Sequence, residues 1–75
     1  MFDSQKLVDD IVGHLKTTVS KERVESVFVA AGATQLEAQD FRWALIDLGC
    51  QITEFEAEQA WAHLRADWRQ IVAKM

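Results

Sequence analysis

Apolar residues recur every three or four positions along most of the chain, a spacing that places them on one face of an α-helix. The first stripe begins after Asp3 and Ser4, which are both suited to cap a helix. It consists of Leu7, Val8, Ile11, Val12, Leu15 and Val19. A second stripe follows Ser20 and consists of Val24, Val27, Phe28 and Ala31. The pattern predicts helices near residues 4–17 and 21–31.

The stretch from residue 32 to residue 61 contains signals for ending and restarting helices. Gly32 and Gly49 each follow an apolar stripe, where glycine suits the left-handed conformation that ends many helices. Two Thr-x-x-Glu sequences, residues 34–37 and 53–56, have the spacing of a capping box. These signals predict that a helix ends at each glycine and that a new one begins soon after it.

A third helix is therefore predicted near residues 35–48 and a fourth near residues 54–74. The fourth carries Ala57, Ala60, Trp61, Leu64, Trp68, Ile71, Val72 and Met75, and the chain has no proline to interrupt it. No segment alternates with the period of a strand. We expect an all-α fold, a compact four-helix domain that covers residues 1–75.

Composition and charge narrow the classes of function. The chain has 75 residues, of which 49% are hydrophobic and 27% charged, and these values fit one folded domain. Its net charge of −4 works against direct nucleic-acid binding, which depends on neutralising phosphates. The helices at 21–31 and 35–48 also have the order of a helix-turn-helix. The second would carry Glu37 and Asp40 toward the phosphates, however, so we expect no direct nucleic-acid partner.

The sequence also bears on compartment. No apolar run approaches the ~20 residues of a membrane span, and the first four residues do not resemble a signal peptide. Cys50 is the single cysteine, so the chain cannot form an internal disulfide, which favours a reducing compartment. We expect a soluble, cytoplasmic protein with no membrane partner.

Few residues are arranged for catalysis. Asp10 with His14, and His63 with Asp67, are spaced to place a carboxylate and an imidazole on one helix face. A zinc site needs three or more convergent ligands, which neither pair supplies. Cys50 follows a predicted helix end, where the helix dipole disfavours a thiolate. The chain also lacks a glycine-rich phosphate loop and a CxxC motif. We expect no enzymatic activity, no cofactor and no bound metal.

About half of the chain, from Phe28 onward, resembles the EF-hand family. Phe28 would end the first helix, residues 29–40 would form the twelve-residue loop, and Phe41 would begin the second helix. Leu36 falls at the eighth loop position, where the family has an aliphatic residue, and Asp40 at the acidic twelfth. The resemblance implies a light-chain-type helical lobe that holds an amphipathic target helix in an apolar groove.

Calcium ligands are missing from this loop. Its first, third and fifth positions are Val29, Ala31 and Ala33, and Thr34 replaces the usual glycine at the sixth. Calcium takes six to eight oxygen ligands, drawn mainly from these positions. The resemblance is therefore to a degenerate, calcium-independent EF-hand.

The helix at 35–48 is apolar on more than one face. Its main stripe consists of Phe41, Ala44, Leu45 and Leu48. Trp43 and Ile46 lie on a neighbouring face, with Arg42 and Asp47 beside them as a polar rim. An exposed tryptophan marks a contact site, whereas burial under another helix would make it ordinary core. We predict these four residues as a partner-binding surface or a homodimer seam.

Two hypotheses for function follow. The first is a non-enzymatic, calcium-independent protein-interaction module that holds an amphipathic helix in an apolar groove or patch. The second is a small acidic inhibitor or accessory protein, of the kind encoded by phages and plasmids, whose carboxylates cover a basic surface of a host nucleic-acid-handling complex.

Overall fold

The computed structural model describes residues 2–75, so that Met1 of the predicted domain lies outside it. Its elements are α1 (Ser4–Thr18), α2 (Lys21–Ala31), a 3-10 turn η1 (Ala33–Gln35), α3 (Ala38–Asp47), α4 (Glu54–His63) and α5 (Arg69–Lys74). The described residues contain no strand, which confirms the all-α fold. Residues 2–75 form one more α-helix than predicted, because the fourth predicted helix is divided in two.

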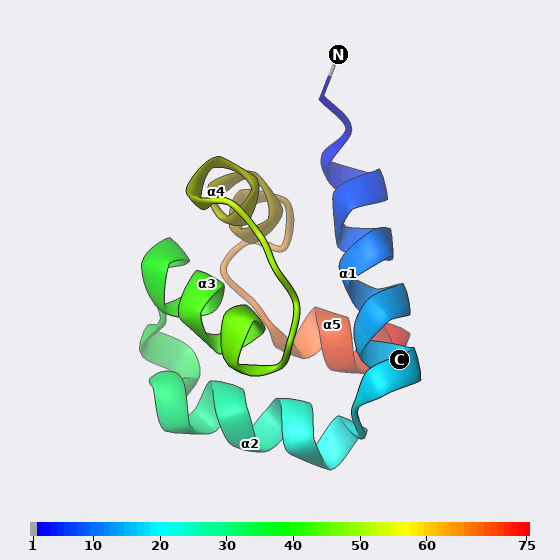
Figure 1. Ribbon diagram of the computed structural model, residues 1–75. Helices are drawn as coiled ribbons and strands as arrows, with labels where there is room; N and C mark the ends of the chain where they lie inside the picture. Colours follow the sequence, from blue (N-terminus) through cyan, green and yellow to red (C-terminus); the bar gives the residue numbers. More distant parts are fainter. Residues whose placement is uncertain (1) are drawn as a thin grey trace.

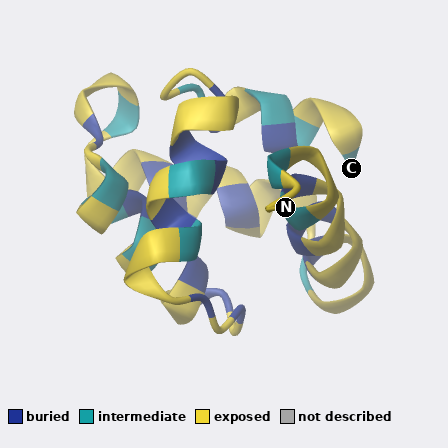
Figure 2. Cartoon of the chain, turned by 90° about the horizontal axis from the view of Figure 1, so that it is seen from above, coloured by how far each residue is buried: buried dark blue, intermediate teal, exposed yellow. Residues whose placement is uncertain are grey.

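The helices surround one core. In Figure 1, α2 crosses the base of the molecule and α3 lies above it on the left. Helix α4 is seen nearly end-on above α3, and α1 runs along the right side. Helix α4 packs against both α3 and α1, while α5 packs against α1 and α2. Figure 2 shows that the buried positions of the helices face the centre of the molecule. This arrangement leaves the outer faces of α3 and the first turn of α4 open to solvent.

Four aromatic rings form a continuous stack through the core. The ring of Phe28 lies between those of Trp68 and Phe41, with centroid separations of 5.3 and 5.9 Å. Phe41 in turn stacks on Trp61 at 4.6 Å. These residues come from α2, α3, α4 and the residue before α5, and all four are buried. The aromatic stack therefore joins four separate segments of the chain.

Three of the predicted helix starts are confirmed by their caps. The side chains of Asp3 and Ser20 each accept a hydrogen bond from the backbone N–H three residues later, at 3.1 and 3.2 Å. At the start of α4, Thr53 Oγ1 accepts from the Glu56 N–H at 3.1 Å, and the Thr53 N–H donates to Glu56 Oε1 at 3.0 Å. The second predicted capping box is therefore present.

The predicted start of the third helix is wrong. Residues 33–35 form the 3-10 turn, and α3 begins only at Ala38. Leu36 between them is extended and buried, so the chain cannot be α-helical from residue 35. The capping box predicted at residues 34–37 is replaced by a hydrogen bond from the Glu37 N–H to Asp40 Oδ2 at 3.1 Å. Burial of the Leu36 side chain decides this local structure.

The fourth predicted helix is also wrong as a continuous element. It ends in a turn, the α4–α5 turn of residues 64–68, in which Arg65 and Ala66 both have left-handed backbone angles, φ 54° and 58°. The Ala66 N–H donates to the Trp61 carbonyl at 3.0 Å, which closes α4. A straight helix over residues 54–74 would be about 31 Å long. Such a helix would span nearly the whole 34 Å longest dimension of the molecule, whereas the turn brings Trp68 back to stack on Phe28 in the core.

Both predicted glycine stops are confirmed. Gly32 is the C-terminal cap of α2 with φ 147°, and Gly49 follows α3 with φ 85°. The Gly49 N–H donates to the Ile46 carbonyl at 2.9 Å, and the chain then turns toward α4. Glycine is favoured at residue 49 because a residue with a side chain would be strained at a φ of 85°.

We expect Gly49→Ala to lower the free energy of unfolding by about 1–2 kcal/mol. No atom lies within 4 Å of a Cβ built at Gly49, so the loss would come from the backbone angle alone. Gly13→Ala is the matched control, because Gly13 lies inside α1 and its Cβ would also meet nothing within 4 Å. That change should raise stability by about 0.5–1 kcal/mol. Urea unfolding measures both, and shifts of the same sign would contradict the backbone assigned at Gly49.

Candidate functional site

Helix α3 presents a buried face to the core and an apolar patch to solvent. Its core face consists of Phe41, Ala44 and Leu45, followed by Leu48 at the helix end. Trp43 and Ile46, which we call the apolar patch, have 53% and 38% of their surface exposed. The helical repeat left open whether Trp43 is exposed or covered by another helix, and the structure shows that it is exposed and not a core residue.

Arg42 is partly buried between the apolar patch and the connection from α3 to α4. Its Nε–H donates a hydrogen bond to the Ile52 carbonyl at 3.0 Å. Its guanidinium carbon lies 5.5 Å from the centroid of the Trp43 ring, within the range of a cation–π contact. Arg42 therefore holds the connection against α3 while it flanks Trp43. The sequence pattern predicts Arg42 only as a polar neighbour of Trp43 and Ile46, and neither of these two contacts.

Asp47, the other predicted rim residue, pairs with α2 instead. Its Oδ2 lies 4.0 Å from Arg23 Nη2, and both side chains are more than half exposed. An exposed pair at this distance contributes at most about 1 kcal/mol. It is the one ion pair formed within residues 2–75. Asp47 thus lies at the edge of the apolar patch nearest to α2.

A hollow of about 560 Å³ borders the apolar patch at Ile46, and we call it the Ile46 hollow. It is lined by Arg42, Ile46, Gln51, Ile52, Thr53 and Glu56. Half of this lining belongs to the connection before α4, which no pattern in the sequence marks as part of a site. The hollow depends on the way Arg42 holds that connection.

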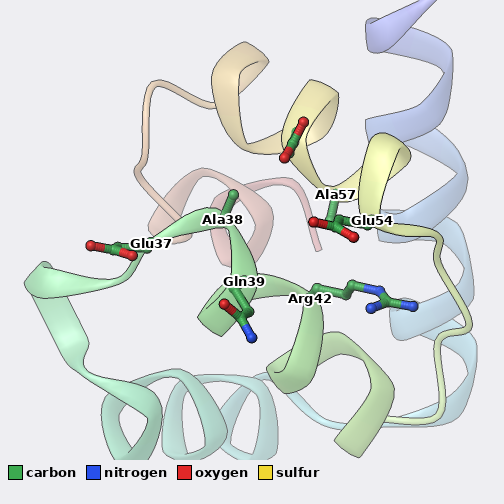
Figure 3. A pocket seen from close by; sticks show the side chains of 7 residues that line it. Glu37, Ala38, Gln39, Arg42, Glu54 and Ala57 are labelled. Atoms are coloured by element: carbon green, nitrogen blue, oxygen red, sulfur yellow. The ribbon is translucent and has the colours of Figure 1, made fainter.

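A second hollow of about 310 Å³, the acidic hollow, lies between the first turns of α3 and α4 (Figure 3). It is lined by Glu37, Ala38, Gln39, Arg42, Glu54, Ala57 and Glu58. Figure 3 shows Arg42 extending from α3 toward the beginning of α4. The carboxylates of Glu37, Glu54 and Glu58 outnumber the single guanidinium of Arg42, which makes this hollow electronegative. Arg42 lines both hollows.

The two predicted His and Asp pairs make other contacts. His14 Nε2 lies 3.1 Å from the Gly49 carbonyl oxygen, so its N–H ties α1 to the end of α3. Asp67 Oδ1 accepts from the Arg69 N–H at 3.0 Å, next to the start of α5. Residues 2–75 hold no group of three or more His, Cys, Asp or Glu side chains that could bind a metal ion.

Cys50 is buried beside α1 and the start of α4. Burial raises the pKa of its thiol above the ordinary 9.0, and the negative charge of Glu56 adds to the shift. Both effects disfavour the thiolate, which is the reactive form of cysteine. The surroundings of Cys50 are therefore those of a packing residue.

This raised pKa predicts a loss of stability in alkali. A thiol whose pKa is higher in the folded than in the unfolded state stabilises the fold below the unfolded pKa, and that contribution disappears as pH rises through the folded pKa. We expect the free energy of unfolding to fall as pH rises above about 9, and to fall less in Cys50→Ala. Urea unfolding at several pH values measures this. Equal alkaline losses in the two proteins would show that Cys50 is not the group responsible.

The fold and this surface define a small all-α domain with an apolar patch and an acidic hollow side by side on α3 and α4. The chain matches no protein-family model, no curated protein and no solved structure. No helix within residues 2–75 is long and apolar enough to cross a membrane.

Proposed function

We propose that the chain is a non-enzymatic protein-interaction module that binds an amphipathic helix of a partner protein, independently of calcium, across α3 and α4. The observation that carries this proposal is the exposure of Trp43, 53%, with Ile46 beside it on the same helix. Tryptophan contributes heavily to binding when it becomes buried at an interface. The resemblance to a calcium-independent EF-hand lobe supports the same mode of binding.

Charge indicates which helix the surface would accept. The apolar patch, with Ile46 and Ile52 in the Ile46 hollow, offers a site for the apolar stripe of a helix, which presents side chains three and four residues apart. The acidic hollow beside them places Glu37, Glu54 and Glu58 where basic side chains of the same helix would be favoured. The proposed partner segment is therefore both amphipathic and basic.

We expect Trp43→Ala to weaken binding of a synthetic leucine–lysine amphipathic peptide by at least about tenfold, which corresponds to about 1.4 kcal/mol. Titration calorimetry measures the affinity, and NMR shift changes should map to α3 and α4. The free energy of unfolding of Trp43→Ala should fall by less than about 1 kcal/mol, because the Trp43 side chain is exposed. Val29→Ala is the matched control, since Val29 on α2 is 57% exposed and lies outside the patch.

Other outcomes have distinct meanings. A stability loss of about 3–5 kcal/mol in Trp43→Ala would show that the residue supports the core, and would contradict the proposal. Equal binding of a leucine–glutamate peptide would contradict the charge argument. Binding that resists Trp43→Ala but is lost in Glu54→Gln with Glu58→Gln would favour the alternative function, an acidic accessory protein that covers a basic surface.

A further inference from the structure

The α4–α5 turn has a backbone conformation that its residues disfavour. Arg65 and Ala66 are consecutive and both left-handed, a conformation that residues other than glycine seldom adopt. Leucine, arginine and alanine, which occupy positions 64–66, are instead among the best helix formers. Local preference in this turn therefore favours continuing α4 as a helix.

The turn is maintained by contacts that α5 makes elsewhere. Trp68 stacks on Phe28, and its Nε1–H donates to the Ala33 carbonyl at 2.9 Å. Ile71 is fully buried. Helix α5 packs mainly against α1 and α2, and α4 is not among its main contacts. Straightening the turn would therefore disrupt little packing between α4 and α5, while it would remove α5 from its docking site.

A second copy of the chain can supply that same docking site. We infer that the protein forms a domain-swapped homodimer, in which α4 and α5 join into one helix and each α5 docks on α1 and α2 of the other copy. The packing of α5 on α1 and α2 is remade between chains, the bond from Gln70 Nε2–H to the Leu64 carbonyl within the turn is given up, and the left-handed residues become helical. Short connections under strain favour such exchange, and α5 is the last helix in the order of the described elements, joined to the others only through the α4–α5 turn (Figure 1).

An isotope experiment identifies the exchanged contact. Labelled and unlabelled chains are unfolded, mixed and refolded at high concentration, and the dimer is isolated by size exclusion with light scattering. Filtered NOE spectra should show contacts between the indole of Trp68 in one copy and the ring of Phe28 in the other, since these rings lie 5.3 Å apart when docked. A chain that stays monomeric, or a dimer without these contacts, would overturn the inference.

Glycine at the turn gives an independent test. Arg65→Gly with Ala66→Gly favours the closed turn of the monomer and disfavours the continuous helix, of which each dimer contains two. We expect the dimer dissociation constant to rise at least a hundredfold. Ala62→Gly is the matched control, because Ala62 is exposed on α4 and helical in both states, and it should leave the constant unchanged. An equal rise in the control would contradict the inference, whereas Trp43→Ala should have no effect.

Discussion

Phe41→Ala is expected to leave most of the protein unfolded. The Phe41 ring is completely buried and contacts its neighbours in the aromatic stack on both sides, with Phe28 and Trp61 at centroid distances of 5.9 and 4.6 Å. Removing a buried phenylalanine ring costs about 3–5 kcal/mol. A single core in a domain this small supplies only about that much net stability. Circular dichroism with urea unfolding measures the loss.

The control is the same substitution at an exposed ring. Phe55 lies on the first turn of α4 with 56% of its surface exposed, and its one ring contact is with Phe2 at 5.3 Å. We expect Phe55→Ala to lower stability by less than about 1 kcal/mol. Comparable losses at Phe41 and Phe55 would show that the aromatic stack is not the main support of the fold.

Trp68→Ala is the second large effect, with an expected loss of about 3–5 kcal/mol. Trp68 ends the aromatic stack and also donates to the Ala33 carbonyl at 2.9 Å, so it holds the start of α5 and η1 together. Hydrogen exchange should show that the amides of α5 lose their protection first. The change therefore tests both the stack and the docking of α5.

Trp68→Phe separates these two roles. Phenylalanine keeps an aromatic ring beside Phe28 but cannot donate the hydrogen bond to Ala33. Leaving a partly buried carbonyl without its partner costs about 1–3 kcal/mol, so this variant should be more stable than Trp68→Ala. If the two variants unfold at the same urea concentration, the hydrogen bond rather than ring packing holds α5.

Local signals predicted the parts of the fold that local interactions control. Asp3, Ser20 and Thr53 each cap a helix through a hydrogen bond to a backbone N–H three residues later. Gly32 and Gly49 end helices through their own backbone angles. Each of these features depends on a few consecutive residues, which is why it can be read from the sequence.

The two errors lie where distant contacts override local preference. The α4–α5 turn contains no glycine or proline, so nothing nearby signals that the helix ends. The cause is Trp68, which reaches a carbonyl 35 residues away. The late start of α3 has a similar cause, because Leu36 turns into the core before the helix begins.

The candidate site likewise has one part that the sequence pattern indicates and one part that only the tertiary structure shows. The period of the helix places Trp43 and Ile46 on a second face of α3, and only the structure shows that no other helix covers that face. The Ile46 hollow was not predictable, because it depends on the hydrogen bond from Arg42 to Ile52 in the connection that follows α3. A site formed by a helix together with an irregular connection requires the tertiary structure.

The positions of the three tryptophans also make the protein its own spectroscopic reporter. The chain has no tyrosine, so its emission comes from Trp43, Trp61 and Trp68. Trp61 and Trp68 end the aromatic stack and are shielded from water, whereas Trp43 is open to it. A small quencher such as iodide will therefore reach Trp43 first, and the quenched fraction reports on the surface of α3. The unquenched emission reports on the integrity of the core, so that occupancy and unfolding are read from one sample.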